Sequence, residues 1–407
     1  MVGGLALGAG LAASGANLPA FVAAAEIVGG LWLDALRMTI IPLVFALLVS
    51  GVVTAASAAA AGGVAGRSIG LFVALLLVAA GTGVVLSYGA LALWPVPPEA
   101  AEALRTSASG LRSIIPTPPE GSAFWQNIIP RNPVKAAADG GILALVVFAL
   151  FIGFALTKLD FEHRAPLVTL FRSLADAMLV IVGWVLLVAP LGVFALAIVV
   201  GARTGVTAAG ALIHYLVTIS AIALSAGLLA YPLAIIAGRV RPLDFARALA
   251  PAQAVAASTQ SSVASLPAMV TSAERLNLPT AVCGVTLPLA VTLFRITNPW
   301  VNVSIAIYVA SIYDMDVGPG VLVAGALVAF ASNFSAVGVP SQINFFTTVT
   351  PILLVMGVPI ELLALLIAVE TIPDIFRTVS NVTMDVAVTT IVARGEELKA
   401  ASSASPG

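Results

Sequence analysis

The sequence predicts an all-α membrane protein with eight transmembrane helices and two re-entrant helical hairpins, and three observations carry this prediction. The 407 residues are 60% hydrophobic and 9% charged, with a mean hydropathy of +1.10, whereas soluble domains carry about 25% charged residues. Long apolar runs dominate, without the alternating pattern of a membrane β-barrel. Two further apolar segments are interrupted near their middles by small and polar residues.

Polar residues separate the apolar runs that we expect to be helices. The runs lie at 2–14, 19–61, 67–94, 140–158, 169–201, 207–237, 279–312 and 357–393. The first run has about 14 residues, fewer than the roughly 20 that cross a bilayer, so the first helix is expected to extend beyond the printed start. A loop rich in proline, glutamate and serine at 95–139 is expected outside the cell, and 396–407 is expected to be a polar cytoplasmic tail.

The two interrupted segments, at about 251–275 and 321–352, predict the hairpins. The first is rich in serine around residues 258–267, and the second contains glycine, proline and serine around residues 335–342. Irregular backbone at membrane depth is tolerated only where it is buried in protein or lines a cavity. Each segment precedes a polar-bearing helix, at 279–312 or 357–393, and this repetition indicates a binding site near the bilayer midplane.

Basic residues predict the orientation, because cytoplasmic loops carry an excess of lysine and arginine. With the N-terminus inside, the inner loops and tail hold more basic residues than the outer loops do. Those inner residues are Arg67, Lys158, Arg164, Arg172, Arg239, Arg241, Arg247, Arg275, Arg394 and Lys399. We therefore expect a multi-pass protein of the cell (inner) membrane with both termini cytoplasmic, in which the first hairpin enters from inside and the second from outside.

Charged and polar residues mark one face of the last apolar run. They are Glu370, Asp374, Arg377, Asn381 and Asp385, at spacings of 4, 3, 4 and 4, which place them on one side of a helix. An ionised group at the bilayer centre costs on the order of 3 kcal/mol on insertion scales. Such a stripe predicts a pathway for a solute or an ion.

Other function classes find little support in the sequence. A net charge of −1 gives no reason to expect a nucleic-acid partner, and a single cysteine, Cys283, excludes an internal disulfide. His163 and His214 are isolated, Cys283 has no partner base, and no metal-ligand cluster or phosphate loop is present. We therefore expect neither an enzyme nor a covalent cofactor. A channel or a receptor on the same scaffold stays open as an alternative, which saturable flux and counterflow would exclude.

Several motifs in order carry a family resemblance. They are Leu36-Arg-Met-Thr-Ile-Ile-Pro-Leu-Val-Phe45, Ile128-Ile-Pro-Arg-Asn-Pro133, Ala189-Pro-Leu-Gly-Val-Phe194, Ser265-Leu-Pro267, Gly338-Val-Pro340 and Asp374 to Asp385. With them the chain resembles, over nearly its whole length, the dicarboxylate/amino acid:cation symporters, which include the glutamate transporters. The resemblance implies a homotrimer that works like an elevator. Helices in 1–66 and 140–206 would form a scaffold, and 67–94 and 207–395 a mobile transport domain.

The resemblance also implies a substrate site for a small acidic solute. Arg377, whose fork suits a bidentate carboxylate, would hold a side-chain carboxylate, and Asp374 would hold an α-ammonium group. Asp374 thus favours aspartate or glutamate over a C4-dicarboxylate, which stays as the alternative. From the residues alone, Asp374 and Arg377 could instead only neutralise each other at i, i+3. Thr378 and Asn381 complete this part of the site.

The two hairpin tips would supply the remaining substrate contacts. Ser261, Ser262 and Val263 would hold the α-carboxylate through hydroxyl and main-chain N–H groups, because a helix N-terminus binds anions. Gly338 would belong to a gate, since glycine permits positive φ. The alternative for a serine-rich turn is a plain helix break.

Cation binding is where the sequence departs from the resemblance. Asn381 and Asp385 match sodium ligands, and their oxygens suit a hard cation; Glu370 would support the site. Five oxygen-bearing positions of a second sodium site are instead apolar: Leu76, Ala79, Ala80, Phe294 and Ile296. We predict that this second site is absent. Coupling would then use fewer sodium ions or protons, or the protein would exchange solutes.

Arg295 lies between two of these apolar positions, Phe294 and Ile296, in the middle of the apolar run 279–312. Its guanidinium could replace the charge of a cation, or it could bind a carboxylate of a more anionic substrate. The plain alternative is that the side chain reaches a membrane interface.

Overall fold

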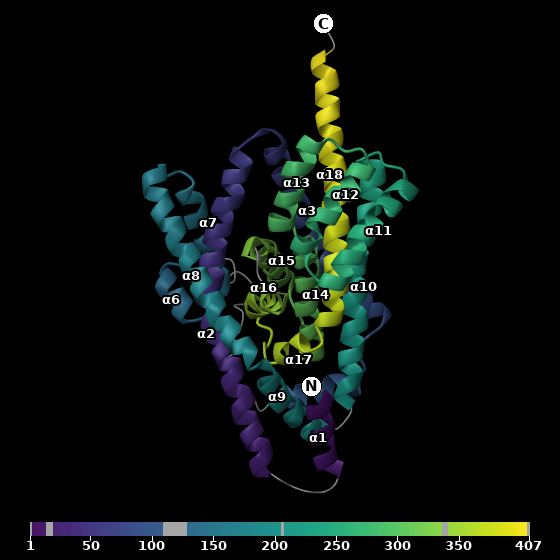
Figure 1. Cartoon of the computed structure of the whole chain (residues 1–407). Helices are drawn as coiled ribbons and strands as arrows, with labels where there is room; N and C mark the ends of the chain where they lie inside the picture. Colours follow the sequence, from purple (N-terminus) through teal and green to yellow (C-terminus); the bar gives the residue numbers. More distant parts are fainter. Residues whose placement is uncertain (1, 14–18, 109–127, 205–206, 336–340, 405–407) are drawn as a thin grey trace.

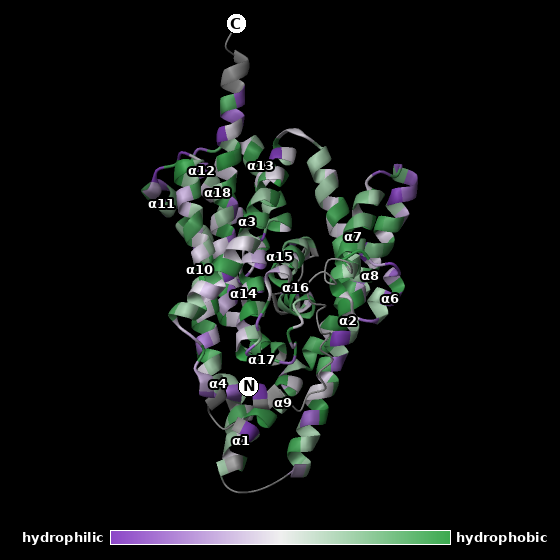
Figure 2. Cartoon of the chain, turned by 180° about the vertical axis from the view of Figure 1, so that it is seen from behind, coloured by the Kyte–Doolittle hydropathy of each residue, from purple (hydrophilic) through white to green (hydrophobic). Residues whose placement is uncertain are grey.

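The computed structural model describes residues 2–13, 19–108, 128–204, 207–335 and 341–404. Every regular element in these ranges is helical, in agreement with the predicted class. Five stretches of the described chain are long and apolar enough to cross a membrane: Pro19–Ala60, Gly63–Leu93, Phe161–Leu187, Ala209–Ile236 and Thr280–Ile312. Hydrophobic residues run along these helices, while hydrophilic ones gather near the ends of the bundle (Figure 2).

The helices form two groups with a hairpin between them (Figure 1). In the first group, α2 (Pro19–Ala60) packs against α7 (Ile142–Leu156), α8 (Phe161–Leu187) and α9 (Ala189–Thr204). In the second, α10 (Thr207–Ile236) packs along α18 (Thr371–Ala404), and α3 (Gly63–Leu93) packs along α13 (Thr280–Leu293) and α14 (Thr297–Ile312). This grouping is compatible with the predicted scaffold and transport domain, whose relative motion stays a prediction.

Both predicted hairpins are helix pairs. The first consists of α11 (Pro242–Thr259) and α12 (Ser262–Arg275), so it begins earlier than the expected residue 251. Its turn uses Gln260 in the left-handed region, at φ 52°. The second consists of α15 (Pro319–Ser332), the 3₁₀ turn η1 (Asn333–Ser335) and α16 (Ser341–Val355). Gly338 at its tip lies outside the described residues.

The expected helix at 279–312 is wrong as a continuous element, because it divides at Phe294–Ile296 into α13 and α14. Pro299 favours the break, since a proline in a helix interior clashes with the carbonyl of residue i−4, here Arg295. Side chains from elsewhere serve the broken ends. Nδ2 of Asn333 donates to the carbonyl of Leu293 at 2.8 Å, and Oδ1 of Asn381 accepts from the N–H of Thr297 at 3.0 Å.

Two other expected helices also divide. The expected helix at 169–201 is α8 followed by α9, and Pro190 follows the break. The expected helix at 357–393 is the short α17 (Leu363–Ile367) followed by α18, which begins at Thr371 and has Pro373 in its first turn, where a proline removes no helical hydrogen bond. Glu370 therefore precedes the helix and does not belong to its face.

The chain ends and the long loop differ from expectation in detail. The expected tail at 396–407 is helical as far as Ala404, where α18 extends beyond the bundle (Figure 1). Residues 95–139 contain α4 (Pro98–Ala108) and α6 (Pro133–Ala138). The first helix, α1 (Val2–Ala13), packs on α9 at the end of the bundle opposite to the end of α18.

Candidate functional site

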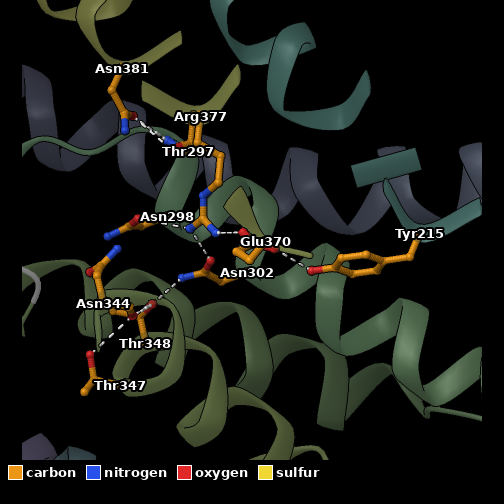
Figure 3. Close-up of polar contacts among 10 residues, drawn as sticks. All are labelled: Tyr215, Thr297, Asn298, Asn302, Asn344, Thr347, Thr348, Glu370, Arg377 and Asn381. Carbon is orange, nitrogen blue, oxygen red and sulfur yellow. Dashed lines mark hydrogen bonds and ion pairs between the residues drawn. The ribbon is translucent and has the colours of Figure 1, made fainter. Parts of the chain in front are cut away.

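Arg377 lies at the centre of a buried polar network that joins α18 to α14 (Figure 3). Its Nη1 donates to Oε1 of Glu370 at 2.8 Å. Its Nη2 donates to Oδ1 of Asn302 at 2.6 Å and to Oδ1 of Asn298 at 3.4 Å. The guanidinium therefore has a carboxylate on one arm of its fork and amides on the other.

Glu370 is a stronger partner of Arg377 than the sequence indicated. Its Oε2 accepts a hydrogen bond from the hydroxyl of Tyr215, on α10, at 2.7 Å. Both side chains of the ion pair are almost fully buried, at 2% and 4% exposure. The alternative pairing of Arg377 with Asp374 is absent from the ion pairs of the described residues.

The network continues from Arg377 into the second hairpin. Nδ2 of Asn302 donates to Oγ1 of Thr348, on α16, at 2.8 Å, and Thr348 donates to the carbonyl of Asn344 at 2.6 Å. Sequence reasoning missed Tyr215, Asn298 and Asn302. A signal for the last two was present: amides four residues apart in an apolar run lie on one helix face.

Asp374 has one carboxylate oxygen to which no described residue donates a hydrogen bond. Its Oδ2 is buried and accepts no hydrogen bond within the described structure. A buried carboxylate oxygen without a donor costs free energy, so such a group normally has a partner. Thr378, one turn further on, is 5% exposed, and its side chain forms no hydrogen bond with the described residues. Asp374 can coordinate a bound cation or accept a hydrogen bond from an ammonium group.

The tip of the first hairpin is an open helix N-terminus. Ser261 caps α12, because its side chain accepts from the N–H of Ala264 at 3.2 Å. Ser262 is 9% exposed and Val263 is 55% exposed. Among the described residues, neither serine side chain bonds to Arg377 or Asp374, so the structure does not join this tip to the Arg377 network by a direct contact.

The predicted cation ligands Asn381 and Asp385 have different surroundings. Oδ1 of Asn381 accepts from both the N–H and the hydroxyl of Thr297, each at 3.0 Å, so both of its lone pairs are used. Asp385 is 1% exposed, and neither of its carboxylate oxygens has a hydrogen-bond partner in the described part of the chain. Asp385 fits a cation, whereas the Asn381 side chain offers it no free oxygen.

The second sodium position does not fit a cation. Its five side chains are hydrocarbon and buried, with exposures from 0% to 3%: Leu76, Ala79, Ala80, Phe294 and Ile296. The ring of Phe294 stacks on that of Phe72 with 4.6 Å between the ring centres. A hard cation needs oxygen ligands, and these side chains have none. In the described ranges, no group of three or more histidine, cysteine, aspartate or glutamate residues could hold a metal ion.

Arg295 lies in the break between α13 and α14. Its Nε is buried and has no hydrogen-bond partner in the described structure. The guanidinium interacts electrostatically with Asp374, Asp385 and Arg377. The expectation that Arg295 compensates acidic charge is compatible with this position and stays a prediction, as does the alternative of a side chain that reaches a membrane interface.

Comparison with known proteins gives consistent matches. The model of the sodium:dicarboxylate symporter family matches residues 1–395. The proton/glutamate-aspartate symporter of Escherichia coli is 26% identical over 393 residues, which cover 90% of this chain and 84% of the relative. The C4-dicarboxylate transport protein of Rhodospirillum rubrum is 25% identical over 381 residues, 91% and 82% of the two chains. The neutral amino acid transporter B(0) of Oryctolagus cuniculus is 29% identical over 422 residues, 95% and 76%.

Proposed function

Since this chain belongs to the sodium:dicarboxylate symporter family, we propose that it carries an acidic amino acid, such as aspartate or glutamate, with reduced sodium coupling. The coarser statement follows from the family and its relatives: the chain is a cation-coupled membrane transporter of dicarboxylates or amino acids, and not an enzyme. The finer statement concerns solute and coupling ion, and it is argued from the site.

The observation that carries the proposal is the pair of binding groups on the first turns of α18. Arg377 directs a buried fork toward α14, and Asp374 has a buried oxygen without a hydrogen-bond partner. An acidic amino acid carries a side-chain carboxylate for the fork and an ammonium group for the acid. A dicarboxylate has no ammonium group to donate to Oδ2 of Asp374, which would then stay buried without a hydrogen-bond partner at a cost in free energy.

The hairpins would complete the enclosure. In this proposal the N-terminus of α12 at Ser261, Ser262 and Val263 receives the α-carboxylate, since free N–H groups and the helix dipole favour an anion there. In the same proposal Gly338 belongs to the gate, and Thr378 and Asn381 contact the bound solute.

Reduced sodium coupling follows from the charges around the break in α13 and α14. Arg295 supplies a fixed positive charge that interacts electrostatically with Asp374 and Asp385, and the five side chains of the second sodium position supply no oxygen ligand. Asp385 keeps a buried carboxylate for one sodium ion or one proton. The proposal therefore has fewer coupling cations than a site with both positions intact.

Assembly and mechanism are proposed from the family. We propose a homotrimer in the cell (inner) membrane, in which the group around α18 moves past the group around α2 as an elevator. The C-terminal end of α18 would lie in the cytoplasm, on the side of the first hairpin.

A C4-dicarboxylate is the second candidate solute, and Arg295 is the observation that favours it. The side chain has an unpartnered Nε close to the charges of the site. A second guanidinium next to Arg377 could bind a second carboxylate. In that case succinate would compete with L-aspartate at equal or lower concentration.

Uptake into liposomes tests the proposed function. Purified protein is reconstituted, and entry of radiolabelled L-aspartate is followed with inward gradients of sodium, potassium or protons. We expect saturable uptake and counterflow, with competition by L-glutamate and weaker competition by succinate. A strict requirement for several sodium ions per solute would refute the coupling proposal, and conductance without counterflow would favour a channel.

A further inference from the structure

Asn302 lies between Arg377 and the second hairpin, and its neighbours fix which end of its amide faces which group. Oδ1 accepts from Nη2 of Arg377 at 2.6 Å, and Nδ2 donates to Oγ1 of Thr348 at 2.8 Å. A guanidinium has donors only. If the amide were reversed, its Nδ2 would face Nη2 of Arg377, and two donors would then oppose each other. Arg377 therefore determines the orientation of the amide.

The next hydrogen bond, within α16, is also donated in the direction away from Arg377. Because the hydroxyl of Thr348 accepts from Asn302, its own proton is available for the carbonyl of Asn344, and that bond measures 2.6 Å. Asn302 and Thr348 are both fully buried, at 0% exposure, so water does not compete for these bonds. A chain of hydrogen bonds, each donated away from Arg377, thus leads from α18 through α14 into α16, the second arm of the hairpin (Figure 3).

We propose that Asn302 is a positioning residue that couples the carboxylate-binding fork of Arg377 to the second hairpin. A solute carboxylate on the fork competes with Oδ1 of Asn302 for Nη2. Once Nη2 is taken, the amide is free to turn and accept from Thr348, which withdraws the Thr348 proton from the Asn344 carbonyl. Binding at Arg377 then changes the hydrogen bonding at the start of α16. This inference rests on the proposed function and concerns how binding reaches the hairpin.

Thr347 provides a matched control. Its hydroxyl donates to the same carbonyl of Asn344, at 3.2 Å. It is also buried, at 2% exposure, but it has no hydrogen bond to Asn302. Thr347→Val and Thr348→Val therefore remove the same atoms from adjacent buried positions, and the second alone breaks the link to Arg377.

Hydrogen exchange and L-aspartate binding test the inference. In the unchanged protein, L-aspartate should alter amide exchange in residues 341–355. In Thr348→Val and Asn302→Ala this response should be lost, and the Kd of Asn302→Ala should fall about three- to tenfold, because Oδ1 of Asn302 no longer competes with the solute carboxylate for Nη2 of Arg377. Thr347→Val and the rescue variant Thr348→Ser should respond as the unchanged protein does. Thr348→Val should add no further loss in the Asn302→Ala background, because both remove one link.

The outcomes separate this inference from the proposed function. If the unchanged protein neither binds L-aspartate nor responds to it, the proposed function fails and the inference fails with it. If the unchanged protein responds, Arg377→Lys abolishes binding, and Thr348→Val still behaves like Thr347→Val, the inference alone is overturned. If Thr348→Val does not fold, the comparison of Asn302→Ala with Thr348→Ser decides instead. The first variant should lose the exchange response, and the second should keep it.

Discussion

Glu370 and Arg377 form an ion pair of 2.8 Å across the start of α18, and both side chains are almost fully buried. A buried pair is strongly destabilised when one partner is removed, by about 3–5 kcal/mol, because the other charge is left uncompensated. Their bonds to Tyr215 and Asn302 link the pair to α10 and α14. The guanidinium of Arg377 is therefore held by partners on both of its arms.

Tyr215→Phe should destabilise the protein, because it removes the donor to Oε2 of Glu370. A hydrogen bond to a charged group contributes about 1.5–3 kcal/mol, so the melting temperature in detergent should fall by several degrees. Tyr231→Phe is the control, since that ring packs on Phe245 with 5.2 Å between centres and its hydroxyl bonds to no described residue. Equal melting temperatures for the two variants would contradict the role of Tyr215.

Arg37→Met should weaken the contact between α2 and the segment before α17. Nη2 of Arg37 lies 2.8 Å from Oε1 of Glu361, whose side chain is 3% exposed. The variant leaves a buried carboxylate without this partner, and the free energy of unfolding should fall by about 3 kcal/mol. Arg203→Met breaks a more exposed pair with Glu26 and should cost about 1 kcal/mol or less. Thermal melts compare the two, and equal losses would argue against the Glu361 contact.

Gly51→Ala should disturb the packing of the second hairpin on α2. A Cβ at Gly51 would lie 2.2 Å from the carbonyl oxygen of Phe334, so α2 and η1 would have to separate. Gly30→Ala, in the same helix, meets nothing within 4 Å and should stabilise α2 by up to about 1 kcal/mol. We expect slower L-aspartate uptake and a lower melting temperature for Gly51→Ala only. Unchanged uptake in Gly51→Ala would show that this contact is not part of the transport cycle.

Arg295→Met should make the protein more dependent on sodium. The variant removes the positive charge near Asp374 and Asp385, and a bound cation can then offset the remaining acidic charge. Sodium should raise the melting temperature of Arg295→Met more than that of the unchanged protein, by the linkage of binding to stability. Arg295→Lys keeps the charge and is the control. The same sodium response in all three proteins would contradict the compensating role of Arg295.

Much of the fold was predictable because hydropathy determines which segments can enter a membrane. The apolar runs, both hairpins and the polar stripe that contains Arg377 were read from local sequence. The breaks at Phe294–Ile296 and before Thr371 were not, although Pro299 and Pro373 lie just after them. A proline is compatible with either a kinked helix or a new one, and only packing decides between these outcomes.

The partners within the site were less predictable than its members. Helical spacing placed Glu370 on the same face as Arg377, but Glu370 precedes α18 and reaches the fork from the turn. Tyr215 and Thr348 are far from Arg377 in sequence, so no local pattern could join them. Asp385 and Arg295 were singled out because charged residues in an apolar run are costly and therefore conspicuous, and their roles stay predictions.

Calorimetric binding of L-aspartate to purified protein tests the central claim most directly. Arg377→Lys keeps the charge but loses the bidentate fork, and Glu370→Gln keeps the fork while it removes the ion pair. The account predicts that Arg377→Lys raises the Kd for L-aspartate by about a hundredfold or more. The Glu370→Gln variant should still bind L-aspartate, and should bind it more tightly than it binds L-glutamine. Equal affinity of Arg377→Lys and the unchanged protein for L-aspartate would contradict a carboxylate site at Arg377.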